Sequence, residues 1–173
     1  MRLHELKRDD FPQIYGLLER SFPPEERRSY EGQEGLLQRE EYKLLGVKDP
    51  SGTLHGVMAV WEFTDFVFLE HFAVEPHSRN FGLGTVMLRE LKNRFPYKGI
   101  CLEAELPTEE LSRRRQEFYG RNGFVPRWQS YIQPSLGEGR EPIALQILST
   151  VDEKDLSFLH IRKELYTKVY GVL

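Results

Sequence analysis

Hydrophobic and polar positions divide the chain into short segments with two different periods. Apolar residues recur every three or four positions in 11–18, 83–95 and 158–169, which is typical of helices that bury one face. Other segments are continuously apolar or alternate, as strands do: 2–7, 42–48, 54–63, 66–74, 100–105, 124–132 and 143–148. A further helix is expected at 107–122, with Thr108 as its cap. This order predicts an α/β (α+β) protein with one mixed sheet.

Turn signals indicate how the segments connect. Asp49-Pro50-Ser51-Gly52 predicts a tight turn between two strands, and the third strand follows at once, so we expect an antiparallel meander. A helix separates the strand at 66–74 from the one at 100–105, which implies that these two run parallel through a right-handed crossover. Thr150-Val151-Asp152-Glu153 has the pattern of a capping box and predicts the start of the C-terminal helix.

Composition narrows the class of protein. With 173 residues, 39% of them hydrophobic, the chain can bury one core. We expect one domain at 1–148, extended by a helix at 149–173. A net charge of −3 argues against general nucleic-acid binding. No apolar run approaches the roughly 20 residues of a membrane span. The single cysteine, Cys101, permits no internal disulfide, so the cytoplasm is the expected location.

The stretch 66–95 carries the clearest chemical signal. A buried strand ends at Glu75-Pro76, and the loop Arg79-Asn80-Phe81-Gly82-Leu83-Gly84-Thr85 then opens a helix. The first N–H groups of a helix have no intrahelical partner, and glycine lets ligand oxygens approach them closely. The sequence therefore predicts a phosphate site at this loop.

The spacing of the glycines distinguishes among phosphate ligands. A P-loop would place Lys after the second glycine, and a dinucleotide fingerprint would place glycine where Met87 stands. The pattern Arg-x-x-Gly-x-Gly, preceded by Phe72-Ala73-Val74-Glu75-Pro76, instead resembles the acetyl-CoA motif of the GNAT superfamily of N-acetyltransferases. A second segment, Phe118-Tyr119-Gly120-Arg121-Asn122-Gly123-Phe124, is similar to that superfamily's aromatic-Tyr-x-x-x-Gly-Phe signature.

The resemblance covers about residues 1–148 and implies the GNAT fold: a central mixed, mostly antiparallel sheet with helices on both faces, here followed by a C-terminal helix. It also implies acetyl-CoA as cosubstrate and no metal. The residues that it assigns to the cofactor are Phe72, Ala73, Val74, Arg79, Asn80, Phe81, Gly82, Leu83, Gly84, Thr85, Arg115 and Phe118. Many members carry Ser-Asn at the start of the second helix, whereas this chain has Thr108, Ser112 and three arginines there.

Acyl transfer from a thioester to an amine needs a base for the amine and a proton donor for the departing thiolate. The resemblance implies Tyr119 as the donor. Glu103 is the first candidate for the base, since Leu-Glu on this strand resembles the ribosomal-protein N-terminal acetyltransferases, whose matching glutamate is catalytic. Glu70 and His71 are rivals, because both are ionisable residues in an otherwise apolar strand. Cys101 as an acyl-carrying nucleophile is less favoured than a buried strand residue.

The acceptor amine is not identified by any motif. The resemblance implies that residues 22–37 lie over the acceptor groove, although Glu25, Glu26, Arg27 and Arg28 read as a solvated charge run. Tyr131 and Glu105 are the candidate acceptor-binding residues. Arginines 113, 114, 115 and 121 are candidates for the 3′-phosphate of CoA.

The expected function is acetyl transfer to a primary amine of a small molecule or protein N-terminus. The alternative is a catalytically silent CoA-binding or scaffold protein. We expect no nucleic-acid or membrane partner, and a homodimer is compatible with the sequence.

Overall fold

One eight-stranded sheet organises the part of the chain that the computed structural model describes, residues 2–172. The strands are β1 (His4–Glu5), β2 (Tyr42–Lys48), β3 (Leu54–Glu62), β4 (Phe66–Val74), β5 (Gly99–Glu105), β6 (Val125–Pro126), β7 (Tyr131–Gln133) and β8 (Ile143–Ser149). They follow the order β1-β2-β3-β4-β5-β8-β6, with β7 also paired to β8. The β4–β5 pair is parallel and every other pair is antiparallel, which confirms the expected mixed sheet.

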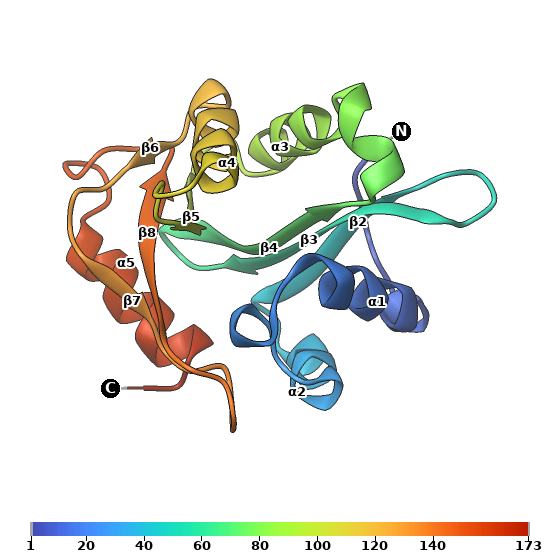
Figure 1. The fold of residues 1–173 in the computed structure, drawn as a ribbon, viewed down its shortest axis with the longest axis horizontal. Helices are drawn as coiled ribbons and strands as arrows, with labels where there is room; N and C mark the ends of the chain where they lie inside the picture. The colour runs from blue at the N-terminus through green and yellow to red at the C-terminus, as the bar shows by residue number, and fades with distance from the viewer. Residues whose placement is uncertain (1, 173) are drawn as a thin grey trace.

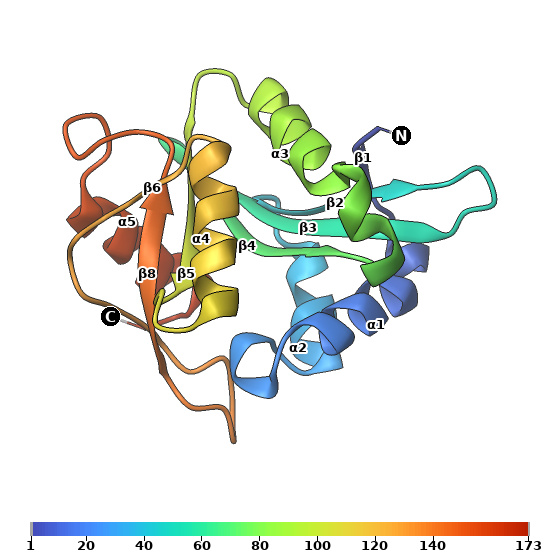
Figure 2. The same ribbon diagram turned by 45° about the horizontal axis from the view of Figure 1, so that its top comes forward.

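Helices cover both faces of this sheet (Figure 1). They are α1 (Phe11–Ser21), α2 (Tyr30–Gly35), α3 (Leu83–Arg94), α4 (Glu110–Arg121) and α5 (Phe158–Glu164), with shorter 3-10 turns at Arg8–Asp10, Pro24–Glu26, Leu36–Gln38 and Pro76–Phe81 and a π-helical turn at Leu165–Val169. The helices α1, α2 and α5 lie on one face, and α3 and α4 on the other (Figures 1 and 2). No helix among residues 2–172 has the length and apolar character needed to cross a membrane.

The central strand β4 is apolar on both sides because both sides are covered. Phe66 and Phe68 belong to the core beneath α1 and α5, whereas Val67 and Leu69 belong to the core beneath α3. A β-bulge interrupts β4 opposite β3: Ala59 pairs with His71 and Val60 with Leu69, so Glu70 is the extra residue.

Three sequence-based predictions of element bounds are wrong. Residues 124–132 do not form one strand, because Pro126 lacks a ladder donor and the buried guanidinium of Arg127 bonds the carbonyls of Val151 and Leu156. The helix α4 begins later than predicted, with Glu109 rather than Thr108 at its cap.

The third error concerns the C-terminal helix, which does not begin at Thr150. The backbone and hydroxyl of Thr150 instead bond Ile100, at 3.0 and 2.9 Å, and extend the pairing between β8 and β5. The helix begins at Phe158, where the Ser157 side chain accepts from the N–H of His160 at 3.1 Å.

Candidate active site

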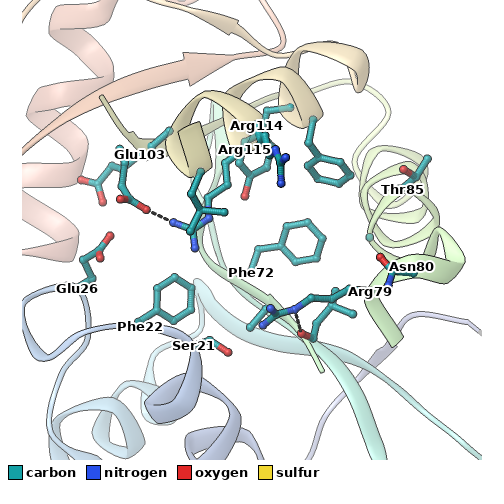
Figure 3. Close-up of a pocket in the computed structure, with 18 of the residues that line it drawn as sticks. Ser21, Phe22, Glu26, Phe72, Arg79, Asn80, Thr85, Glu103, Arg114 and Arg115 are labelled. Carbon is teal, nitrogen blue, oxygen red and sulfur yellow. Dashed lines mark hydrogen bonds and ion pairs between the residues drawn. The ribbon is translucent and has the colours of Figure 1, made fainter. Parts of the chain in front are cut away.

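A cleft opens where the two parallel strands part. Their pairing ends at Leu69 of β4 and Leu102 of β5. The last three residues of each strand, 72–74 of β4 and 103–105 of β5, line a cavity of about 780 Å³. The cleft is also lined by the loop before α3, by α4 and by the segment after α1 (Figure 3). It thus brings together side chains from segments between Ser21 and Tyr119.

One end of the cleft is formed by the start of α3. Gly82 has a φ of +73°, in the left-handed region, and a Cβ there would meet no protein atom within 4 Å. A Cβ on Gly84 would instead approach the Phe118 ring to 3.2 Å. The Arg79 Nε donates to the Val74 carbonyl at 2.9 Å, which ties the loop to the end of β4. A bare backbone turn at a helix N-terminus, flanked by arginine, fits a pyrophosphate.

Most residues assigned to the cofactor line this cleft. They are Phe72, Ala73, Val74, Arg79, Asn80, Gly82, Gly84, Thr85, Arg115 and Phe118. Two others do not: Leu83 is buried in the core, and the Phe81 side chain is largely exposed. Arg114 lines the cleft as well, whereas Arg121 lines a smaller hollow of about 390 Å³ with Arg89 and Lys92. The assignment of these residues to acetyl-CoA stays a prediction.

Glu103 lies on β5 just beyond Leu102, the last residue paired with β4, and lines the cleft. The hydroxyl of Tyr131 donates to its Oε2, and the hydroxyl of Tyr170 lies 2.6 Å from Oε1 and 2.8 Å from Oε2. Burial raises the pKa of Glu103 to about 7, although the two phenol hydrogen bonds oppose the shift. A carboxyl that titrates near neutrality is suited to general-base work.

Tyr119 reaches the same cleft from α4. Its ring packs against Phe118 and Phe124, with centroids 5.4 and 5.7 Å away. Burial raises the pKa of Tyr119 to about 12, and Arg115 opposes this only in part. Because of this raised pKa, the phenol stays protonated at physiological pH. Its hydroxyl has no hydrogen-bond partner among residues 2–172, so it is free to donate into the cleft.

The two rivals of Glu103 are occupied elsewhere and do not line the cleft. Glu70 forms a buried ion pair with Arg28 at 2.8 Å and accepts from the Trp61 indole at 2.8 Å. Burial favours the neutral acid, but Arg28, His71 and the Trp61 hydrogen bond together hold the pKa of Glu70 below its ordinary value. The Nε2 of His71 lies 2.7 Å from the Glu26 carbonyl oxygen, and burial lowers the pKa of His71. These contacts favour structural roles for both.

Cys101 is fully buried within the sheet. Burial is the larger cause and the negative charge of the neighbouring Glu103 the smaller one, and both raise the pKa of the thiol well above its ordinary value. A protonated, inaccessible thiol is unsuited to carry an acyl group.

The end of the cleft opposite the glycine loop is acidic. Glu26 points toward Glu103 across the cleft (Figure 3), and its burial, with the nearby Glu105 carboxylate, raises the pKa of Glu26. Glu105 is paired with Arg115. Tyr131 is buried and does not line the cleft, so its hydroxyl reaches Glu103 instead of open space. Its assignment to the acceptor stays a prediction.

Sequence reasoning missed Glu26 and Tyr170. Glu26 belongs to a charge run typical of solvated surface, and no motif marks Tyr170, which contacts Glu103 across 67 positions. Among residues 2–172, no group of three or more His, Cys, Asp or Glu side chains is arranged to hold a metal ion.

Comparisons with known proteins bear on this geometry. The family model of a GNAT acetyltransferase domain matches residues 41–126, which include β4, the glycine loop, β5 and α4. A structure of a GNAT-family protein from Bacteroides thetaiotaomicron is 32% identical, with all of both chains covered and a TM-score of 0.88. This likeness confirms the fold that the motifs predict. No curated protein matches the chain.

More distant structures share the fold. A mutant of a spermidine N-acetyltransferase from Vibrio cholerae is 17% identical, with 90% of this chain and 98% of that one covered and a TM-score of 0.64. A ribosomal-protein-alanine N-acetyltransferase from Escherichia coli is 22% identical, with 85% and 90% covered and a TM-score of 0.63. Their acceptors differ from one another, so the fold alone does not select one.

Proposed function

Because the chain belongs to the GNAT family and is an acyltransferase, we propose that it transfers the acetyl group of acetyl-CoA to a primary amine by direct attack. One observation carries this proposal: Glu103 and Tyr119 line the same cleft whose far end is the glycine loop at α3. A base, a proton donor and a phosphate site within one cavity meet the needs of acetyl transfer.

The protein groups divide the work between the two bonds that change. Acetyl-CoA supplies the acetyl group as a thioester. As the amine nitrogen bonds the acetyl carbon, Glu103 takes the proton that the nitrogen loses, directly or through water. As the carbon–sulfur bond breaks, Tyr119 donates to the departing sulfur, and both residues then exchange protons with solvent. The products are an N-acetyl amine and CoA thiol.

The edge of β4 is a source of electrophilic assistance. Beyond Leu69, β4 has no pairing with β5 in the described chain, so a backbone N–H on that edge is free to donate to the carbonyl oxygen of the thioester. The buried Cys101 thiol supports direct attack over a protein-bound acetyl intermediate.

The acidic end of the cleft favours a cationic acceptor. Burial and Glu105 both disfavour the charged form of Glu26, and Arg115 offsets this only in part, so an ammonium group beside Glu26 would stabilise its carboxylate. An amine that carries a second positive charge would therefore gain more than a neutral monoamine, since one nitrogen reacts while the other stays charged.

A matched panel of amines tests this assignment. Thiol release from acetyl-CoA is measured with monoamines, diamines and peptides with free N-termini, for wild type and Glu26→Gln. We expect turnover with at least one amine and a KM for it raised by about tenfold in Glu26→Gln, with little change in the KM for acetyl-CoA. The control is Glu25→Gln, which does not line the cleft. Bound CoA without turnover of any amine would instead favour a silent CoA-binding protein.

A further inference from the structure

The contacts of Glu103 reach beyond the cleft to the C-terminal end of the chain. Tyr131 comes from β7, and Tyr170 follows the π-helical turn Leu165–Val169. Neither side chain lines the cleft, and no motif of the sequence marks Tyr170. Both hydroxyls nevertheless donate hydrogen bonds to the carboxyl group of Glu103, which we propose as the base.

From this geometry we propose that Tyr131 and Tyr170 form a two-phenol clamp that positions Glu103, so that the C-terminal segment is a working part of the active site. This inference rests on the proposed function for its catalytic meaning. The clamp itself is a property of the folded chain. Tyr131 and Tyr170 are positioning residues, because they act through Glu103 and do not line the cavity.

The clamp leaves Glu103 able to accept a proton. An ionised carboxylate offers about four acceptor positions, and each phenol brings one proton. Two acceptor positions therefore remain for an amine or water in the cleft. Burial and the proximity of Glu103 raise the pKa of both phenols above the ordinary tyrosine value, so both stay donors at physiological pH.

The backbone fixes Tyr170 in place. Its N–H bonds the carbonyl of Leu165 at 3.0 Å, five positions back, which is the π-helical pattern and is frequently found at functional sites. One turn earlier, the Tyr166 hydroxyl donates to the Ile132 carbonyl at 2.5 Å and joins the segment to β7. The C-terminal segment is thus attached to the strand that supplies the other phenol.

Other charged and titratable groups also face Glu103. Glu70 on β4 raises the pKa of Glu103, and Arg28 from the segment before α2 lowers it. Cys101 precedes Glu103 by two positions on β5, and Glu26 points toward it across the cleft (Figure 3). The two phenols oppose the effect of burial by direct hydrogen bonds to the charged form. Removing one hydroxyl should therefore raise the pKa of Glu103 further while the surrounding charges stay the same.

The test measures this titration without any substrate. Protein labelled with 13C at glutamate carboxyls is titrated by NMR, and the Glu103 signal is assigned by its loss in Glu103→Gln. We expect a midpoint near the value of about 7 in wild type, and a rise of about one pH unit in Tyr170→Phe, in line with the strength of a hydrogen bond to a charged group. Tyr97→Phe is the control, since it removes the hydroxyl of a side chain that is 98% exposed and so lies outside the buried cluster around Glu103.

The same variants separate the clamp from the proposed reaction. In kinetics with a reactive amine, the acidic limb of the pH profile should shift upward with the NMR midpoint in Tyr170→Phe and Tyr131→Phe. The Tyr170→Phe change should add little to the loss in a Glu103→Gln background. An unmoved Glu103 midpoint in both single variants would overturn the clamp, even if activity fell. A shifted midpoint in a protein that acetylates no amine would leave the clamp intact and refute the proposed function. Tyr131→Phe keeps the test decisive if Tyr170→Phe does not fold.

Discussion

The pH dependence of acetyl transfer is the most informative consequence of the site, because it isolates one carboxyl. Burial raises the pKa of Glu103 to about 7, and the group must be ionised to take a proton. The rate should therefore be full above this value and fall as the pH drops through it. With a pKa of about 7, only about one carboxyl in ten is ionised at pH 6, so the base-dependent rate there should be about tenfold below its plateau.

The assay must separate Glu103 from the amine, which also titrates. Profiles of kcat and kcat/KM are measured by thiol release with several amines of different pKa. A limb that belongs to Glu103 stays near pH 7 for all of them, whereas a limb that belongs to the amine follows the amine. Glu103→Gln keeps the size of the side chain, removes the base, and should abolish the limb with about a 100-fold loss of kcat.

A limb that survives in Glu103→Gln would refute this reasoning. If Glu70→Gln or His71→Gln removed it, the base would be one of those residues. If none of the three variants changed it, the amine would lose its proton to solvent and positioning would carry the rate.

Three further predictions concern other parts of the site. Gly82→Val should weaken acetyl-CoA binding, measured by calorimetry, at least tenfold, about 1.4 kcal/mol. Gly52→Val in the β2–β3 turn is the control, because it places the same side chain at another positive φ outside the cleft. Unchanged affinity in Gly82→Val would exclude the loop as the phosphate site. Tyr119→Phe should lower kcat about 100-fold with the KM for acetyl-CoA little changed, as expected for one donor to developing charge; an undiminished kcat would remove Tyr119 from the chemistry. Glu70→Gln leaves the Arg28 guanidinium buried without its anionic partner and should cost about 3–5 kcal/mol of stability; a wild-type midpoint in urea would contradict the structural role.

The sequence predicted the elements whose pattern follows from burial. The bounds of β2 and β4 agree with the predicted segments, and the parallel pairing of β4 with β5 follows from the helix between them. These succeed because local period and connection length determine them. The glycine loop was predictable for the same reason, since strand, turn and helix start are adjacent in the chain.

The errors arise where distant contacts override a local pattern. The apparent capping box at Thr150 fails because its hydroxyl and backbone bond Ile100, fifty positions away. The clamp on Glu103 depends on Tyr170, which lies 67 positions further along the chain. Glu26 lines the cleft, although it belongs to a segment whose charged composition is typical of solvent-exposed surface. No local period carries this information, so only the folded chain reveals it.

The most direct test of acetyl transfer at this cleft is the amount of amide formed per CoA released. Wild type and Glu103→Gln are each incubated with acetyl-CoA and a reactive amine, and both products are quantified by mass spectrometry. We predict equal amounts of N-acetyl amine and CoA from wild type, with formation about 100-fold slower in Glu103→Gln at pH 7.5 although it still binds acetyl-CoA. Amide formation at the wild-type rate in Glu103→Gln, or CoA release without amide in wild type, would contradict the proposed mechanism.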